Sequence, residues 1–316
     1  MTPLFDELIG QPLAVCILKA ALRRKRLAPA YVFAGPEGVG RRLAALRFLE
    51  GVLSEGKGCH RARRRLEERN HPDLIWIEPT WQYRGCLLTR SEATVAGVSR
   101  RTPPQLRLEQ IRDISRSLAH QPVETTRGMV VIEAAETMTE AAANALLKTL
   151  EEPGHGLLIL LSSAPERLLI TIRSRCQLIR FMRLDTDAVN KVLRRLNAVE
   201  DDPPELLAMA AGSPGALIEH RKHWSTLPQE LVSGLRQLST EPMQALVLAR
   251  DICESLDGEQ QLWLINWWQQ ALWASTSNIQ FLKRLETLRY HLLSFVQPRL
   301  AWEVALLDIF LLTAQT

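Results

Sequence analysis

The chain has 316 residues, of which 46% are hydrophobic and 23% are charged, as in a globular protein of two or three domains with a sizeable core. No apolar stretch reaches the roughly 18 to 20 residues that a membrane span needs, and the N-terminus lacks the basic start and apolar core of a signal peptide. Five cysteines, an odd number with no CxxC pair, make a disulfide framework a poor interpretation. We therefore expect neither secretion nor membrane insertion, and predict a cytoplasmic protein.

The positive charge is concentrated in the N-terminal part of the chain. Residues 1–200 carry 31 basic and 22 acidic side chains (31 − 22 = +9), and residues 201–316 carry 8 and 13 (8 − 13 = −5). This asymmetry predicts a polyanion near the first part and a different partner for the last part. The clusters Arg23 to Arg26 and Arg61 to Arg65 have the charge that contact with a DNA backbone needs, although such runs are more often solvated helix faces.

The first predicted elements are a helix, a strand and a second helix. Residues 13–27 have apolar positions at helical spacing, and Pro29 breaks this pattern before the apolar run 31–35. The run leads into a glycine-rich turn and then into a helical segment, 41–53. Strand, glycine loop and helix form the context in which a phosphate-binding loop is credible.

Three further apolar runs, each bounded by Gly or Pro, predict strands over residues 74–79, 128–135 and 156–165. A helical segment over 139–153 separates the last two. Strands that alternate with helices predict a parallel sheet with flanking helices in an α/β domain.

The remaining segments differ in character. The polar stretch 81–104, with Arg100 and Arg101 near its end, is interpreted as an irregular surface loop. Beyond about residue 184 every apolar run has a helical period, so the chain is predicted to be all-α from there on. Tryptophans in the last third fall near helical spacing, which predicts either core positions or a subunit interface; they are Trp263, Trp267, Trp268 and Trp273.

The glycine-rich turn has the spacing of a phosphate-binding loop, with Gly35, Gly38 and Gly40 before a helix. Two of its functional positions are altered. Arg41 stands where a lysine would reach the β- and γ-phosphates, and Arg42 stands where a Ser or Thr hydroxyl would hold Mg²⁺. Since a guanidinium cannot ligate a cation, we predict a degenerate loop that serves as a scaffold turn.

A second change lies at the end of the strand over 128–135. Glu133 and Ala134 follow this strand where a nucleotide hydrolase of this layout has a Mg²⁺-binding Asp and then a Glu that polarises water. Alanine cannot polarise water, and Glu133 alone is predicted to be a solvated carboxylate rather than a metal contact. Together with Arg41 and Arg42, this degenerate acidic pair favours loss of hydrolysis.

Five segments, taken in chain order, resemble the clamp-loader subunits of bacterial DNA polymerase III, an AAA+ family. They are FDELIGQ (5–11), GPEGVG (35–40), TEAAANALLKTLEEP (139–153), SSAPERLLITIRSRCQLI (162–179) and AAGSPGAL (210–217). The resemblance covers roughly residues 1–220, and the rest matches only in length and helical character. It implies an AAA+ α/β domain over 1–182, a small helical lid over 183–222, and an all-α collar over 223–316 through which five subunits form a ring.

In that family an SRC motif carries an arginine finger, and this motif corresponds to Ser174, Arg175 and Cys176. The resemblance therefore implies that Arg175 acts in trans on the ATP of a neighbouring subunit. A fixed guanidinium can neutralise charge that develops on a γ-phosphate. Without the flanking motif, a surface salt bridge would be the simpler interpretation of Arg175.

The chain also departs from the family pattern. Active members have a lid arginine after a Gly-Ser pair, whereas Gly212 and Ser213 are followed here by Pro214 and Gly215. Many members hold zinc with four cysteines, but this chain offers only dispersed candidates, so we predict no metal. These candidates are Cys59, His60, His71 and Cys86.

The resemblance implies a non-hydrolysing subunit that helps load the sliding clamp onto primed DNA. The implied partners are gamma/tau-type and delta-type subunits, the sliding clamp, and primed DNA through the assembled complex. ATP and Mg²⁺ would be bound by the neighbouring subunit and not by this chain. Two alternatives stay open: an active ATPase subunit in which Arg41 replaces the loop lysine, and a stand-alone basic DNA-binding protein.

Overall fold

The computed structural model describes residues 4–96, 103–237, 241–294 and 296–313. Contacts divide the chain into two compact units. The first consists of residues 1–92, 104–199 and 212–216, and the second of residues 93–103, 200–211 and 217–316. The predicted three-part division stays a prediction, and the segment predicted as the lid contributes residues to both units. Within the described ranges, each helix is either too short or too polar to be a membrane span.

A five-stranded parallel sheet forms the centre of the first unit, with the strand order β2-β5-β6-β1-β7. The strands are β1 (Ala30–Ala34), β2 (Leu74–Ile77), β5 (Gly128–Ile132), β6 (Gly156–Ser162) and β7 (Gln177–Arg180). Every residue of β1 and β6 is buried, as expected for strands that are covered on both faces. The predicted α/β fold with a parallel sheet is confirmed.

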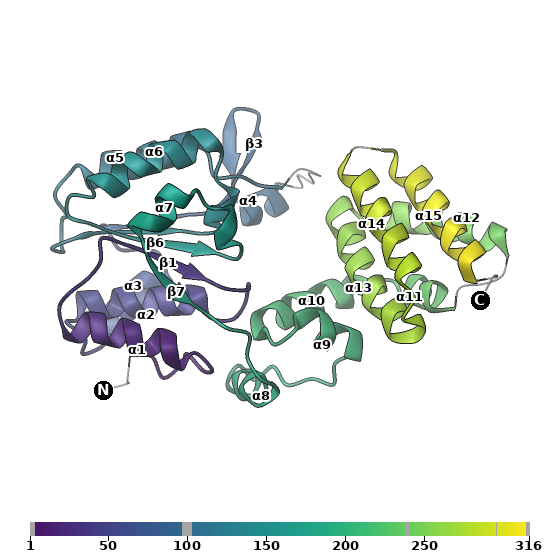
Figure 1. The fold of residues 1–316 in the computed structure, drawn as a ribbon, viewed down its shortest axis with the longest axis horizontal. Helices are drawn as coiled ribbons and strands as arrows, with labels where there is room; N and C mark the ends of the chain where they lie inside the picture. The colour runs from purple at the N-terminus through teal and green to yellow at the C-terminus, as the bar shows by residue number, and fades with distance from the viewer. Residues whose placement is uncertain (1–3, 97–102, 238–240, 295, 314–316) are drawn as a thin grey trace. The chain divides into compact units, whose positions relative to one another are not determined.

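Helices cover both faces of this sheet (Figure 1). One face carries α1 (Pro12–Arg23), α2 (Arg41–Leu53) and α3 (His60–Glu67), and the other carries α5 (Leu108–Leu118), α6 (Glu140–Glu151) and α7 (Ile170–Arg175). Alternate residues of β1 feed the two apolar clusters, with Tyr31 and Phe33 on the first side and Ala30 and Val32 on the second. Helix α8 (Thr186–Arg195) also belongs to this unit.

The segment after β2 corrects one prediction. Residues 81–104 were expected to be irregular, but β3 (Trp81–Tyr83) and β4 (Cys86–Leu88) form an antiparallel hairpin, followed by α4 (Arg90–Val95). Arg84 and Gly85 connect the strands with positive φ angles of 48° and 86°, as in the type I′ turns that match the twist of two-residue hairpins. Strands of three residues are too short to show an alternating pattern. Arg100 and Arg101 lie outside the described residues.

The second unit is helical, as the sequence predicts. Its elements are α9 (Pro204–Ala210), most of α10 (Pro214–Thr226), α11 (Gln229–Arg236), α12 (Pro242–Ser255), α13 (Gly258–Thr276), α14 (Ile279–Leu293) and α15 (Pro298–Thr313). Trp267 and Trp268 are fully buried and Trp263 is 7% exposed, so these three are core residues. Trp273 is 47% exposed and therefore does not belong to the core.

Candidate functional site

The glycine loop lies between β1 and α2, where the sequence places it. Gly40 precedes the first residue of α2 in the left-handed region, at a φ of 102°, and Gly38 has a φ of 74°. Only glycine adopts these angles without strain. The backbone of the loop is therefore shaped as the spacing predicts.

The start of α10 packs directly on this loop. The Ser213 hydroxyl donates a hydrogen bond to the carbonyl oxygen of Glu37, and the Gly215 N–H donates to the carbonyl oxygen of Gly38 over 3.1 Å. A Cβ atom on Gly38 would lie 2.4 Å from the nitrogen of Ala216. The loop and the first turn of α10 thus approach each other so closely that neither Gly38 nor Gly215 has room for a methyl group.

Arg41, at the position of the phosphate-binding lysine, is half-buried, and its Nη1 atom is buried without a hydrogen-bond partner among the described residues. Burial lowers the pKa of its guanidinium, and the carboxylates of Glu136, Glu37 and Glu133 offset only part of that effect. Glu136 itself accepts hydrogen bonds from the backbone N–H and the hydroxyl of Ser163. Arg41 therefore faces a group of acidic side chains.

Arg42 and Glu133, two separate changes in the sequence, are neighbours in the structure. Arg42 Nε lies 3.6 Å from Glu133 Oε1. The same oxygen accepts a hydrogen bond from Trp76 Nε1 over 2.7 Å and lies 3.6 Å from Arg69 Nη2. The guanidinium groups of Arg42 and Arg69 lie over the Trp76 ring, at 5.3 and 4.9 Å from its centroid.

This environment decides the charge and accessibility of Glu133. Burial raises the pKa of its carboxyl group, while the nearby Arg42 guanidinium acts in the opposite direction. The carboxylate is half-buried and contacts two arginines and an indole N–H, so the expectation of a simply solvated group at a strand end is wrong.

The structure does not gather a metal site among the described residues, because no group of three or more His, Cys, Asp and Glu side chains comes together there. Of the four dispersed zinc candidates, Cys59 and Cys86 are exposed thiols. His71 is buried, and its Nδ1 accepts a hydrogen bond from the backbone N–H of Asp73 over 3.2 Å. That the chain binds no metal stays a prediction from the sequence.

Arg175 is the last residue of α7, and its side chain is 38% exposed. Its Nη2 donates a hydrogen bond to Glu151 Oε1 over 2.7 Å, and its Nη1 donates to the carbonyl oxygen of Thr171 over 3.2 Å. Glu151 ends α6, so this ion pair joins two neighbouring helices. The guanidinium is therefore held in place and still reaches solvent.

The two other residues of the motif have local roles in the structure. The Ser174 hydroxyl donates to the carbonyl oxygen of Thr171 over 3.1 Å. Cys176 packs against the apolar cluster beneath α6 and α7, and burial raises the pKa of its thiol to about 12. A thiol with so high a pKa is not a nucleophile near neutral pH, so Arg175 is the chemically available member of the three.

The sequence did not predict that Glu151 contacts Arg175 or that Glu136 lies near Arg41. Glu151 belongs to the recognised segment 139–153, but nothing in its spacing indicates Arg175 as its partner. Glu136 follows Glu133 by three residues, and this proximity is the one signal that could have placed it near the loop. Both contacts depend on tertiary structure.

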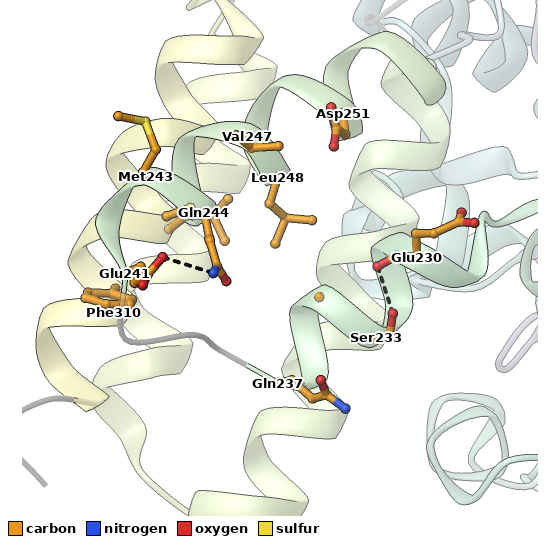
Figure 2. Close-up of a pocket in the computed structure, with 13 residues that line it drawn as sticks. Glu230, Ser233, Gln237, Glu241, Met243, Gln244, Val247, Leu248, Asp251 and Phe310 are labelled. Carbon is orange, nitrogen blue, oxygen red and sulfur yellow. Dashed lines mark hydrogen bonds between the residues drawn. The ribbon is translucent and has the colours of Figure 1, made fainter.

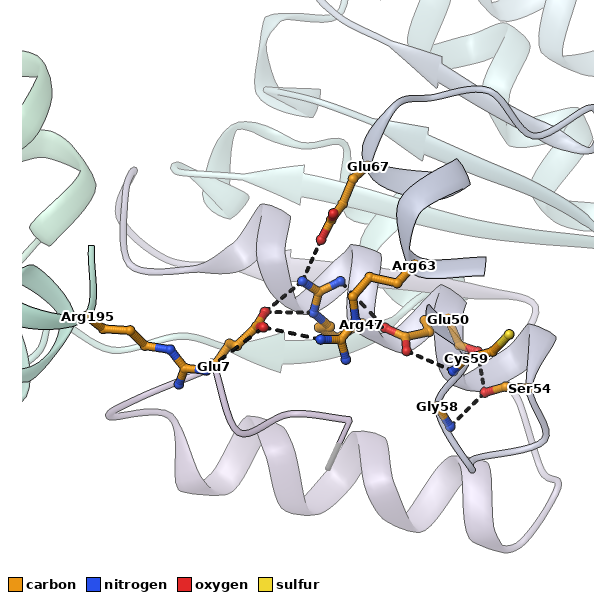
Figure 3. A network of polar contacts seen from close by, with 9 residues as sticks. All are labelled: Glu7, Arg47, Glu50, Ser54, Gly58, Cys59, Arg63, Glu67 and Arg195. Carbon is orange, nitrogen blue, oxygen red and sulfur yellow. Dashed lines mark hydrogen bonds and ion pairs between the residues drawn. The ribbon is translucent and has the colours of Figure 1, made fainter. Parts of the chain in front are cut away.

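The second basic cluster is largely used in ion pairs. Arg63 contacts Glu7 and Glu50, together with Arg47, in the network of Figure 3. Arg65 donates two hydrogen bonds to Glu124, over 2.6 and 3.0 Å. Side chains that are already paired are less available to a DNA backbone. By contrast, Arg23 to Arg26 are exposed, and Lys25 pairs with Glu55.

Two family models match the chain in succession. The model for "DNA polymerase III, delta subunit" matches residues 10–185. The model for "Cyanobacterial DNA polymerase III delta prime, C-terminal domain" matches residues 187–309.

Curated relatives agree with these matches. The chain is 32% identical to DNA polymerase III subunit delta′ of Bacillus subtilis over 57% of its own length and 50% of that protein. It is 32% identical to subunit delta′ of Pseudomonas aeruginosa over 72% of its own length and 66% of that protein. Subunit tau of Escherichia coli is 27% identical over 83% of the chain, but over only 37% of its own length. The matches to the first two relatives thus span half and about two thirds of their lengths.

A solved structure supports the fold. A gamma subunit-related DNA polymerase III protein of Thermotoga maritima superimposes with a TM-score of 0.52, over 93% of this chain and 98% of that one, at 17% identity. With more than half of its length matched by a family model, and with the AAA+-type α/β architecture described above, the chain belongs to the delta prime family of DNA polymerase III clamp-loader subunits.

Proposed function

We propose that this chain is a non-hydrolysing subunit of the clamp loader and helps other subunits place the sliding clamp on primed DNA in the bacterial cytoplasm. Its partners on this proposal are gamma/tau-type and delta-type subunits. The delta′ and tau relatives support this assignment. The observation that carries the absence of hydrolysis is the ion pair between Arg42 and Glu133.

The residues present do not fit a hydrolytic Mg²⁺-ATP site. Arg42 brings a fixed positive charge to the Glu133 carboxylate, where a hydrolase would place a divalent cation. Ala134 provides no carboxylate to polarise water. In addition, the first turn of α10 packs on Gly38 and brings no lid arginine to the loop. We therefore assign no step of ATP hydrolysis to this chain.

The proposed chemical contribution of the chain is Arg175, acting on the ATP of an adjacent subunit. Its guanidinium is 38% exposed at a helix end, where it donates hydrogen bonds to Glu151 and to the carbonyl oxygen of Thr171 within this chain. A planar guanidinium can donate to two phosphate oxygens at once and neutralise charge that develops on the γ-phosphoryl group. No residue of the nucleotide loop of this chain takes part in that role.

The test is to reconstitute the clamp loader with Arg175→Ala and measure clamp-dependent ATPase activity and clamp loading. Loss of a finger typically slows hydrolysis on the order of 10³-fold or more at the affected site. The total ATPase rate falls only in part unless the sites act in sequence. Arg173→Ala removes a neighbouring exposed arginine from the same helix and is the matched control. A complex with Arg175→Ala that loads clamps at the parental rate would make this chain a purely structural subunit.

A second candidate, nucleotide binding without hydrolysis, is favoured by the buried Nη1 atom of Arg41, which has no hydrogen-bond partner among the described residues. Titrating the isolated chain with Mg²⁺-ATP in a calorimeter distinguishes a chain that binds no nucleotide from one that binds it without hydrolysis. If the degenerate loop of this chain binds no ATP, as the leading proposal expects, the titration shows no saturable heat of binding. Binding that disappears in Arg41→Ala would establish this second candidate instead.

A further inference from the structure

The second unit contains an apolar pocket of about 440 Å³ between α11, α12 and α15. Figure 2 shows the side chains that line it, with Leu248 pointing between α12 and α11. Leu306 and Phe310 contribute buried apolar surface from α15. Met243 is 68% exposed and Val247 is 41% exposed, so the apolar lining extends to the surface and the pocket forms an open groove. The volume lies within the roughly 300 to 1,000 Å³ typical of binding pockets.

The charged residues that line this pocket are all acidic. Glu230, Glu241 and Asp251 lie around the apolar side chains, and the 13 lining residues, all in the described part of the chain, include no Lys, Arg or His. Arg250 lies next to Asp251 and donates to its carboxylate, but does not line the pocket. The surrounding sequence has the same sign, since residues 201–316 carry 8 basic and 13 acidic side chains (8 − 13 = −5).

The shape of the pocket favours a helix as its occupant. The lining residues run from Glu241, directly before α12, along this helix to Asp251, ten residues away, which corresponds to roughly 15 Å at the rise of an α-helix. Eleven of the 13 lining residues belong to α11, α12 and α15, so the described lining offers no strand edge on which an extended peptide could form a ladder. An amphipathic helix can instead insert apolar side chains spaced at i, i+3, i+4 and i+7.

We propose that this groove binds a cationic amphipathic helix of a partner protein, with the apolar face of that helix on Met243, Val247 and Leu248. Basic residues at the edge of the helix would face Glu230, Glu241 and Asp251. The apolar contacts provide most of the affinity, whereas the rim charges select the partner and orient it. The pocket includes none of the residues that carry the proposed function, Arg42, Glu133 and Arg175.

The probe is a fluorescein-labelled helical peptide of roughly three turns, built from Leu on one face and Lys on the other. A second peptide has Glu in place of Lys, and a third has the same composition as the first in an order without helical periodicity. Fluorescence anisotropy with the full-length chain measures all three dissociation constants. We expect the Leu/Lys helix to bind at least about tenfold more tightly than either of the others.

Two variants locate the binding site. Met243→Lys and Glu230→Lys change exposed residues of the groove and should each weaken binding about tenfold. Glu254→Lys makes the same charge change on α12 at a side chain that is 68% exposed and outside the lining, so binding should change less than about twofold. Circular dichroism melting curves show that each variant is folded.

Three results would overturn the proposal. If Glu254→Lys weakens peptide binding as much as Glu230→Lys does, the attraction is a general one to an acidic surface. If the non-periodic peptide binds as tightly as the Leu/Lys helix, the groove does not select a helix. Competition with self-association of the chain, measured by sedimentation, would make a second copy the occupant. Clamp loading by the Met243→Lys complex is a separate readout, so failure of this proposal leaves the role of Arg175 open to its own test.

Discussion

Arg42 Nε lies 3.6 Å from Glu133 Oε1, so the residue in place of a metal-binding hydroxyl pairs with the residue in place of a metal-binding carboxylate. The two changes compensate each other electrostatically, since the Arg42 guanidinium, together with that of Arg69, provides positive charge next to a carboxylate that is half-buried. Replacing Arg42 alone therefore leaves Glu133 with Arg69 and the Trp76 N–H as its partners and weakens the compensation.

Partial repair of the loop should not create an ATPase. Arg41→Lys combined with Arg42→Thr restores two side chains, but Ala134 still cannot polarise water and Gly215 still provides no lid arginine. Phosphate release by the isolated double variant should stay at the background rate. Turnover that depends on Mg²⁺ after these two changes alone would show that the acidic pair is more functional than its sequence indicates.

The contact between the loop and α10 should contribute to stability. Gly38→Ala introduces a Cβ atom 2.4 Å from the nitrogen of Ala216, which forces a backbone shift. We expect a loss of roughly 1 to 3 kcal/mol beyond the strain of the left-handed conformation. Gly56→Ala is the control, because Gly56 has a similar φ of 82° with no atom within 4 Å of the new Cβ. Equal melting temperatures of the two variants would argue against the contact.

The network in Figure 3 should make stability depend on acidic pH. Burial alone would raise the pKa of Glu7, but the hydrogen bond and charge of Arg47, with the charges of Arg63 and Arg195, lower it below 4.5. The folded pKa is thus below the unfolded value, so this stabilisation is present above about pH 4.5 and is lost as the pH falls through the folded pKa.

Denaturant titrations from pH 6 downward test this expectation. Glu7→Gln should lower the free energy of unfolding at pH 6 and reduce its decline with acid, because a neutral amide does not take up the proton. Glu55→Gln is a control at an exposed ion pair with Lys25, where little change is expected. A variant whose acid dependence matches that of the parent would remove Glu7 as its source.

The ion pair between Glu151 and Arg175 should compete with the proposed role in trans. Both side chains are partly exposed, at 52% and 38%, so the pair is worth about 1 kcal/mol or less. Glu151→Gln should therefore raise the clamp-dependent ATPase rate of the reconstituted complex by no more than about fivefold. Glu152→Gln changes the next residue along the chain and serves as the control. A fall in rate with Glu151→Gln would instead make Glu151 a residue that positions the guanidinium productively.

The sequence predicts the parts of the fold in which a local pattern is strong. Strands β1, β5 and β6 are nearly continuous apolar runs because helices cover both of their faces, and these strands were predicted. Strand β7 was missed because it is at the edge of the sheet, and Ile179 is its one buried residue. The hairpin over 81–88 was missed for a related reason, since its strands have three residues each.

At the candidate site, the sequence identifies which groups have been lost and which residues replace them, but not the contacts that the replacements make. Arg41, Arg42 and Ala134 are visible as departures from a nucleotide-hydrolase pattern. The packing of Gly215 on Gly38 joins residues 177 positions apart (215 − 38 = 177). The Trp76 ring under the Arg42 guanidinium belongs to β2, whereas Arg42 belongs to α2. No local pattern contains such contacts, because they arise only when the chain folds.

Arg175 and the glycine loop are connected through two neighbouring strands, β7 and β1. Arg175 is followed by Cys176 and then by β7, which pairs with β1, the strand that leads into the loop. Here the loop is packed against the protein's own backbone. On the proposed function, no nucleotide exchange at this chain's own loop would disturb the pair of strands that leads to Arg175, so only events at the neighbouring site set when the arginine acts.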